Sequence, residues 1–203
     1  MFVSVQRLID SVRLRGHPSS RVKEVVQLRS ELRALPHRSQ QVSRIELERA
    51  RELRQLRAEL SATLTDVESC KSCARGYPEP HGFWDGGNCC GATTRALFDE
   101  TELATLRLAG TTAGALDPPS GPHAGCAFRG ETGCSLDAVD RPNICVRYVC
   151  RDLARELHTR GLLDRIDELR DAIGAAYKAF TEAREARLLD EALGVPDLIP
   201  ERT

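Results

Sequence analysis

The eight cysteines of this chain all lie within residues 70–150, and this clustering limits the possible folds more than any other feature. They are Cys70, Cys73, Cys89, Cys90, Cys126, Cys134, Cys145 and Cys150. Cys70 and Cys73 form a C-x-x-C pair, which is typical of tetrahedral metal sites. Cys126 and Cys134 each follow a glycine, which lets the backbone turn close to a metal. We therefore predict that the clustered cysteines form a site, built on loops, of the kind that binds metal.

Four disulfides are the other way to use eight cysteines. The first ten residues, MFVSVQRLID, lack a basic region followed by an unbroken apolar core, so they predict no export signal. Thiols remain reduced in the cytosol, where a cysteine-dense segment binds metal or performs redox chemistry more often than it forms disulfides. We therefore expect a cytoplasmic protein with metal-bound cysteines.

Four patterns in residues 70–150 together resemble the YkgJ-type cysteine-cluster family, described as a zinc- or iron-chelating domain. The patterns are the C-x-x-C pair, the vicinal Cys89-Cys90, the pair C-A-F and G-C-S-L, and the ending R-P-x-x-C with a later cysteine. The resemblance implies metal binding by the whole set of eight. Relatives are often labelled iron–sulfur proteins, and flagellin lysine N-methylases contain a similar cluster. Residues 74–88 separate the first pair from the vicinal pair more widely than in many relatives, so no grouping of cysteines by metal is carried over.

The spacing alone does not choose between the two cofactors, because zinc and an iron–sulfur cluster each take four ligands. The resemblance favours an iron–sulfur cluster, with zinc as the alternative. Consecutive residues project in different directions, so Cys89 and Cys90 serve one centre only where the backbone is irregular. Otherwise they serve two centres, or one of them is a reactive thiol. His81 and His123 either complete a site or are solvated loop residues.

Arg141 precedes Pro142 in the last pattern and has two interpretations. It could neutralise a negatively charged thiolate cluster, or it could form an ion pair with Asp137 or Asp140. Trp84, the only tryptophan, lies in a glycine- and proline-rich loop and either covers the metal or packs under that loop.

Composition predicts a mainly α fold, because 41% of the 203 residues are hydrophobic but only 4% are aromatic. No apolar run approaches the roughly 20 residues that span a bilayer, and neither end has a lipidation signature, so we expect no membrane partner. Residues 1–65 carry 13 basic and 7 acidic side chains, a balance of +6. No aromatic residues alternate with these arginines to stack on bases, so we do not expect nucleic-acid binding.

Three helices are predicted before the cysteines. Phe2, Val5, Leu8, Ile9 and Val12 recur at helical spacing, and a second helix runs from Arg21 to Leu35 with Ser20 as its N-cap. Ser39 could begin a third, longer helix that leads to Cys70. Its predicted coiled-coil seam comprises Val42, Ile45, Arg49, Leu53, Leu56, Leu60 and Leu64. Glu46 with Arg49 and Glu48 with Arg51 would form exposed pairs.

Within the cysteine-rich segment, Asp99 is expected to cap a helix that ends at Gly110. Residues 126–128 and 134–136 are expected to form a β-hairpin that brings Cys126 and Cys134 together. Pro142 would begin a helix that carries Cys145, Tyr148 and Cys150 and continues to Gly161. A long last helix is predicted to bury Leu162, Ile166, Leu169, Ile173, Ala176, Phe180 and Ala183.

We therefore predict a helical pair or small bundle with an irregular, metal-stabilised module that contains at most a short β-hairpin. Its parts would be an N-terminal helical segment (1–66), the cysteine module (67–153) and a C-terminal helix (154–203) packed on the first segment. The predicted function is an iron–sulfur protein with a redox, electron-transfer or sensing role and a protein partner on its helices. A zinc-stabilised interaction module is the alternative. An enzyme of the lysine-N-methylase kind comes third, because the sequence has no nucleotide loop, H-E-x-x-H motif or nucleophile elbow.

Overall fold

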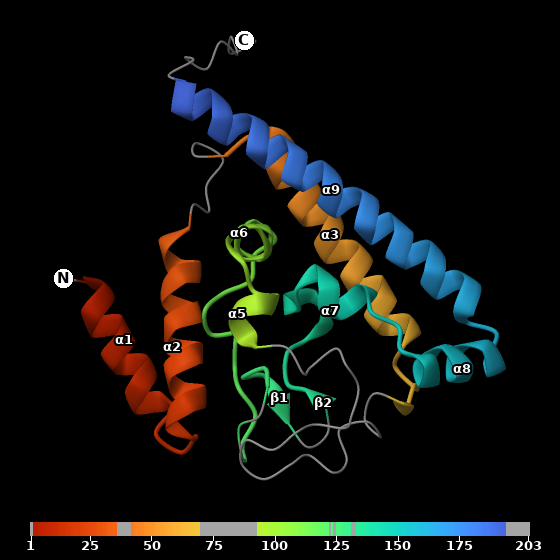
Figure 1. Cartoon of the computed structure of the whole chain (residues 1–203), viewed down its shortest axis with the longest axis horizontal. Coiled ribbons are helices and arrows are strands. Elements are labelled where there is room, and N and C mark those ends of the chain that lie inside the picture. The colour runs from red at the N-terminus through yellow and green to blue at the C-terminus, as the bar shows by residue number, and fades with distance from the viewer. Residues whose placement is uncertain are drawn as a thin grey trace.

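The computed structural model describes residues 2–35, 42–69, 93–121, 123, 125–130 and 133–193, and it is mainly helical (Figure 1). The elements are α1 (Phe2–Arg13), α2 (Ser19–Ala34), α3 (Arg44–Thr63), α5 (Thr94–Leu97), α6 (Glu100–Leu108), β1 (Arg129–Gly130), β2 (Gly133–Cys134), the 3-10 turn η3 (Ala138–Asp140), α7 (Asn143–Arg147), α8 (Arg151–Thr159) and α9 (Leu163–Leu193). The expected mainly α fold with a short hairpin is confirmed. Within the described ranges, no helix combines the length and the apolar character needed to cross a membrane.

The two longest helices, α3 and α9, lie side by side in antiparallel orientation (Figure 1). The start of α3 meets the end of α9, where Arg187 Nε donates to Glu46 Oε2 at 2.7 Å. The end of α3 meets the start of α9, where Arg165 pairs with Glu59. The predicted apolar face of the last helix is confirmed from residue 166 to residue 180. Its buried apolar members are Ile166, Leu169, Ile173, Ala176 and Phe180.

The predicted seam of α3 is wrong at several positions. Ile45 and Arg49 are exposed, and the buried residues of α3 are Glu46, Ala50, Leu53, Arg57 and Leu60. Glu46 is buried because Arg187 neutralises it and because it completes a capping box with Ser43, the N-cap of α3. Glu46 therefore does not pair with Arg49, which forms an ion pair with Glu52 instead. Glu48 forms an ion pair with Arg44 and not with Arg51. The predicted start at Ser39 lies outside the described residues.

A second core joins the N-terminal helices to the segment that carries the later cysteines. Its buried members are Leu14, Val25, Leu28, Leu32, Leu97, Phe98, Leu103, Leu106, Leu116, Cys126, Ala127, Phe128 and Leu136. The Phe98 and Phe128 rings are tilted against each other with centroids 5.4 Å apart. The described part of the cysteine-rich segment therefore packs on α2 through apolar side chains.

Two buried arginines of α2 hold the loop before β1. Arg21 donates to the carbonyl oxygens of Pro119 at 2.7 Å, Gly121 at 2.9 Å and Arg129 at 2.8 Å. Arg29 donates to the Leu116 carbonyl at 3.0 Å. These bonds provide donors to carbonyl oxygens of the loop and of β1, and they fix the backbone on both sides of Cys126.

Three local predictions need correction. Helix α2 begins at Ser19 after Pro18, with no side-chain cap, so Ser20 is not its N-cap. The hairpin has only two residues per strand, with Arg129 opposite Cys134, and Cys126 precedes it. The predicted helix from residue 142 to residue 161 is broken into α7 and α8 at residues 148–150. By contrast, Asp99 caps α6 as predicted, and Gly110 follows it with a φ of 96°.

Candidate metal centre

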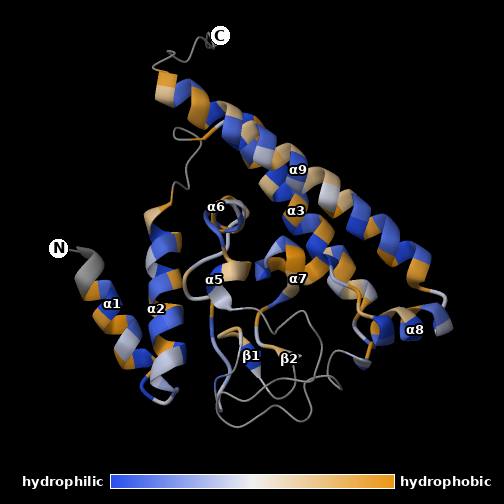
Figure 2. Ribbon diagram, viewed as in Figure 1, coloured by the Kyte–Doolittle hydropathy of each residue, from blue (hydrophilic) through white to orange (hydrophobic). Residues whose placement is uncertain are grey.

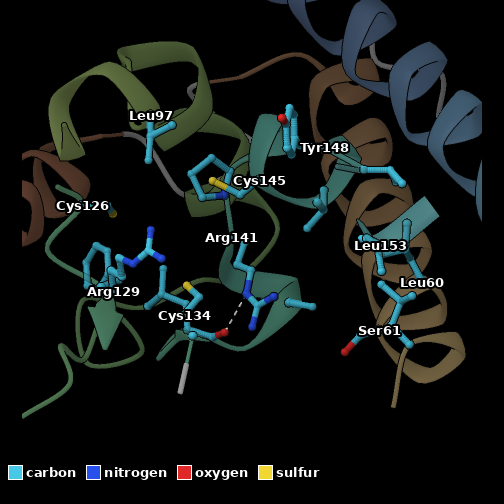
Figure 3. A pocket seen from close by; sticks show the side chains of 18 of the residues that line it. Leu60, Ser61, Leu97, Cys126, Arg129, Cys134, Arg141, Cys145, Tyr148 and Leu153 are labelled. Atoms are coloured by element: carbon cyan, nitrogen blue, oxygen red, sulfur yellow. Dashed lines mark hydrogen bonds between the residues drawn. The ribbon is translucent and has the colours of Figure 1, made fainter. Parts of the chain in front are cut away.

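A cavity of about 460 Å³ lies between the hairpin, α5, α7 and the C-terminal end of α3. Three of the four described cysteines line it, Cys126, Cys134 and Cys145. Figure 3 shows these cysteines together with Arg129 and Arg141 toward one side, and Leu60 and Leu153 on the other. The sequence places the three cysteines in different local structures, so only the tertiary fold brings them to one space.

Each of these three cysteines is positioned by a different local cause. Cys126 is buried in the loop that Arg21 holds, just before β1. Cys134 ends the hairpin as the partner of Arg129 and follows Gly133, whose φ of 108° is in the left-handed region that favours glycine. Cys145 lies in α7, which follows Pro142 as predicted, since proline suits the start of a helix.

Cys150 has a different position, at the N-terminus of α8. Its Sγ accepts a hydrogen bond from the Leu153 amide at 3.5 Å, so the thiol acts as the N-cap of that helix. Its neighbour Val149 and the bonded Leu153 both line the cavity, although Cys150 itself is not among the described lining residues. The structure therefore brings Cys150 beside the cavity wall and gives it a structural role.

The other predicted ligands Cys70, Cys73, Cys89 and Cys90 lie outside the described residues, as do His81 and Trp84. No disulfide joins two of the four described cysteines. In the part of the chain that the structure describes, no group of three or more His, Cys, Asp and Glu side chains is arranged to hold a metal ion. A complete metal centre at this cavity would therefore need ligands from residues 70–92.

His123 is neither a solvated loop residue nor positioned at the cavity. The side chain is buried, its Nδ1 lies 2.8 Å from Ser20 Oγ, and its Nε2 lies 3.2 Å from the Gly125 carbonyl oxygen. Both ring nitrogens therefore have protein partners. His123 therefore connects α2 to the loop before Cys126.

The cavity wall is mostly apolar, and its charged lining residues are cationic. Arg129 and Arg141 line it, and none of its described lining residues is Asp or Glu. Arg141 Nε donates to the Leu136 carbonyl oxygen at 2.8 Å, and the described residues show no ion pair with Asp137 or Asp140. The Asp140 carboxylate instead accepts from Thr111 at 2.7 Å and lies 3.5 Å from Arg54. Of the two interpretations of Arg141, the ion pair is wrong.

Burial controls the protonation of the thiol at Cys126. Burial, with a smaller contribution from the nearby Cys134, raises the pKa of Cys126 to about 12, despite a hydrogen bond from the Phe128 backbone. The thiol is therefore protonated at neutral pH when no metal is bound. A metal ion would deprotonate a coordinating thiol outright, so metal binding at Cys126 would release a proton.

Sequence reasoning missed a buried ionic network behind α7. Glu102 accepts the Asn143 amide with both carboxylate oxygens at 3.0 Å, at the first turn of the helix that carries Cys145. The fully buried Arg57 lies 3.8 Å from Glu102, and none of its three guanidinium nitrogens has a hydrogen-bond partner among the described residues. The desolvation lowers the pKa of Arg57, whereas negative charge on Glu102 and on Cys145 would raise it. The sequence signal was weak, because a single arginine between Leu56 and Leu60 does not show by itself that it is buried.

Comparison with protein-family models, with curated proteins and with solved structures finds no match for this chain.

Proposed function

We propose that this protein binds a metal centre through its cysteines, and that the centre is an iron–sulfur cluster with an electron-transfer or redox-sensing role. One observation carries the proposal. Cys126, Cys134 and Cys145 come from three chain segments and line one cavity that contains no described carboxylate. Soft sulfur ligands suit zinc and iron–sulfur clusters, whereas hard cations such as magnesium need oxygen ligands.

The electrostatics of the cavity support a thiolate centre. Four thiolates bring more negative charge than the metal neutralises in either kind of site. Arg129 and Arg141 on the cavity wall and Arg57 behind α7 would offset that charge. Cys126, Cys134, Cys145 and Cys150 would be held by the described fold, and Cys70, Cys73, Cys89 and Cys90 would complete the set of eight.

The cavity has room for a cluster of several iron and sulfide ions. A volume of about 460 Å³ is much larger than one ion requires, since even a water molecule takes only about 30 Å³. A structural zinc site has its four ligands directly around the ion and leaves little space. A cluster of several iron and sulfide ions occupies more of such a cavity.

Anaerobic purification followed by iron, zinc and acid-labile sulfide analysis tests the proposal. We expect a brown protein with iron and sulfide that bleaches in air, because exposed sulfides and thiolates oxidise. Cys134→Ser and Cys145→Ser should each reduce cluster occupancy, whereas Ser61→Ala, which also lines the cavity, should not. A colourless protein with stoichiometric zinc and no sulfide would instead assign the zinc-stabilised interaction module. A folded protein without either metal would contradict metal binding altogether.

A further inference from the structure

Helix α1 packs on the protein with its polar side. Asp10 is only 2% exposed, and its carboxylate pairs with Arg33 at 2.6 Å and with Arg29 at 3.3 Å, both on α2. Arg7 Nε donates to Ser30 Oγ of α2 at 3.0 Å. These contacts fix which side of α1 faces the protein, because a buried carboxylate without its arginines would be costly.

The apolar side of α1 faces outward as a result. Val5 is 55% exposed, Leu8 65%, Ile9 38% and Val12 46%. Their spacing of three, one and three residues places them in one stripe along the helix. Figure 2 shows the alternation of hydrophobic and hydrophilic segments along α1 at the edge of the molecule. The stripe, defined by these four residues, has no covering element among the described parts of the chain.

The exposed charged side chains of α1 and of the turn after it are basic. Arg13 ends α1 and Arg15 follows in the turn, and both side chains are exposed. The only acidic residue among residues 1–20 is Asp10, which is buried and neutralised by α2. The outward side of α1 therefore combines apolar side chains with positive charge and has no negative charge of its own.

The stripe is too small to hold a second copy of the chain by itself. A helix of 12 residues is about 18 Å long and about 10 Å wide, so one side offers roughly 200 Å². A stable protein interface buries about 800 Å² on each partner. A lipid surface has no such minimum area, because the strength of binding scales with the apolar area buried between headgroups and acyl chains and with attraction to anionic lipids.

We propose that α1 lies in the plane of an anionic lipid bilayer, with Val5, Leu8, Ile9 and Val12 inserted and Arg13 and Arg15 at the lipid phosphates. The expectation of no membrane partner came from the lack of a spanning segment and of lipidation signals, and neither is needed by a helix that lies on the surface. Binding is reversible and weakens with salt, because a single short helix with Arg13 and Arg15 at the lipid phosphates provides limited attraction. It does not depend on the metal centre.

Co-sedimentation of the full chain with vesicles tests this proposal. We expect binding to vesicles of phosphatidylcholine mixed with phosphatidylserine, and much weaker binding to phosphatidylcholine alone. Leu8→Gln should reduce the partition about tenfold, since it removes one buried leucine from the lipid. Leu189→Gln is the matched control, because Leu189 on α9 is 59% exposed and should leave the partition unchanged.

The contribution of the two arginines to lipid binding is tested separately. Arg13→Gln and Arg15→Gln should each weaken binding to the anionic vesicles about fivefold, with no effect on phosphatidylcholine vesicles. Circular dichroism checks that every variant is folded. Iron and zinc analysis of the same samples tests the metal proposal separately, so failure of one proposal is not mistaken for failure of the other. Absence of vesicle binding by the wild-type protein, or equal losses for Leu8→Gln and Leu189→Gln, would overturn the proposal. A dimer in sedimentation velocity that Leu8→Gln dissociates would overturn it in favour of self-association.

Discussion

Glu102 shows how a single buried residue connects the helical core to the candidate metal centre. Burial raises its pKa from the ordinary 4.5 to about 7, although the Asn143 amide and the Arg57 guanidinium both favour the ionised form. Asp99 and Tyr177 also face the Glu102 carboxyl. Burial and the negative charge of Glu102 raise the pKa of Tyr177. The carboxyl therefore ionises near neutral pH, directly behind the helix that carries Cys145.

This raised pKa predicts a pH-dependent stability. The folded protein holds the Glu102 proton more tightly than the unfolded chain, so its stabilising contribution is complete below pH 4.5 and is lost as the pH rises through about 7. The contribution is at most about 3 kcal/mol. Urea unfolding between pH 5 and pH 8 should show wild-type stability falling relative to Glu102→Gln, which cannot ionise. Parallel curves for the two proteins would refute this role of Glu102.

Arg21 supports a second prediction on single residues. Arg21→Ala would leave the buried Arg129 carbonyl and the part-buried carbonyls of Pro119 and Gly121 without this donor, and we expect a loss of about 2 to 4 kcal/mol in the free energy of unfolding. Lys23→Ala on the same helix is the matched control, since Lys23 is exposed and should change stability little. Urea denaturation measures both, and equal effects would contradict the bonding role of Arg21.

At the scale of elements, the break between α7 and α8 places Cys150 at a helix start. Hydroxyl side chains are good N-caps, and replacing a cap by alanine costs about 1 kcal/mol. In the metal-free protein, Cys150→Ser should therefore keep or slightly raise the free energy of unfolding, whereas Cys150→Ala should lower it by about that amount. The metal content of the same variants separates the two roles. If Cys150 is also a ligand, both variants lose metal, and unchanged metal content would leave it as a cap alone.

At the scale of the whole molecule, two apolar cores meet across the cysteine-rich segment. The first core joins α3, α8 and α9, and the second joins α2, α6 and the hairpin region. The sequence predicts a metal-stabilised module in this part of the chain. Its described residues also bury large apolar side chains, since Phe98, Leu103, Leu106, Leu116 and Phe128 are all nearly fully buried.

Metal removal should therefore loosen the protein locally. Chelation or oxidative loss of the centre should increase amide hydrogen exchange at β2 and α7, because metal-binding free energy contributes to the folding of its ligands. Protection in α6 and in the α3–α9 pair should persist, since apolar burial holds them. Hydrogen exchange with mass spectrometry measures both regions. A collapse of protection in α9 together with β2 would show that the metal holds the entire fold.

The sequence alone determined the features that depend on local chemistry. Apolar spacing was sufficient for α9, where Ile166, Leu169, Ile173 and Phe180 repeat on one face, and the cap and glycine signals were sufficient for α6. Proline chemistry was sufficient for the start of α7. These signals act over a few residues, so a single sequence contains all of the information that they require.

The tertiary structure decided everything that depends on partners distant in sequence. Glu46 lies on the buried face of α3 because Arg187 of α9 reaches it, and Arg57 lies there beside Glu102 of α6. No local sequence pattern predicts such pairs. The same cause turns the apolar stripe of α1 outward, since Asp10 is drawn inward by Arg29 and Arg33. Cys126, Cys134 and Cys145 likewise share one cavity because α2 and α6 hold their segments in place. A buried charge is costly unless it has a partner, and here the partners come from other helices. Which charged residues are buried is therefore decided only when the helices pack together.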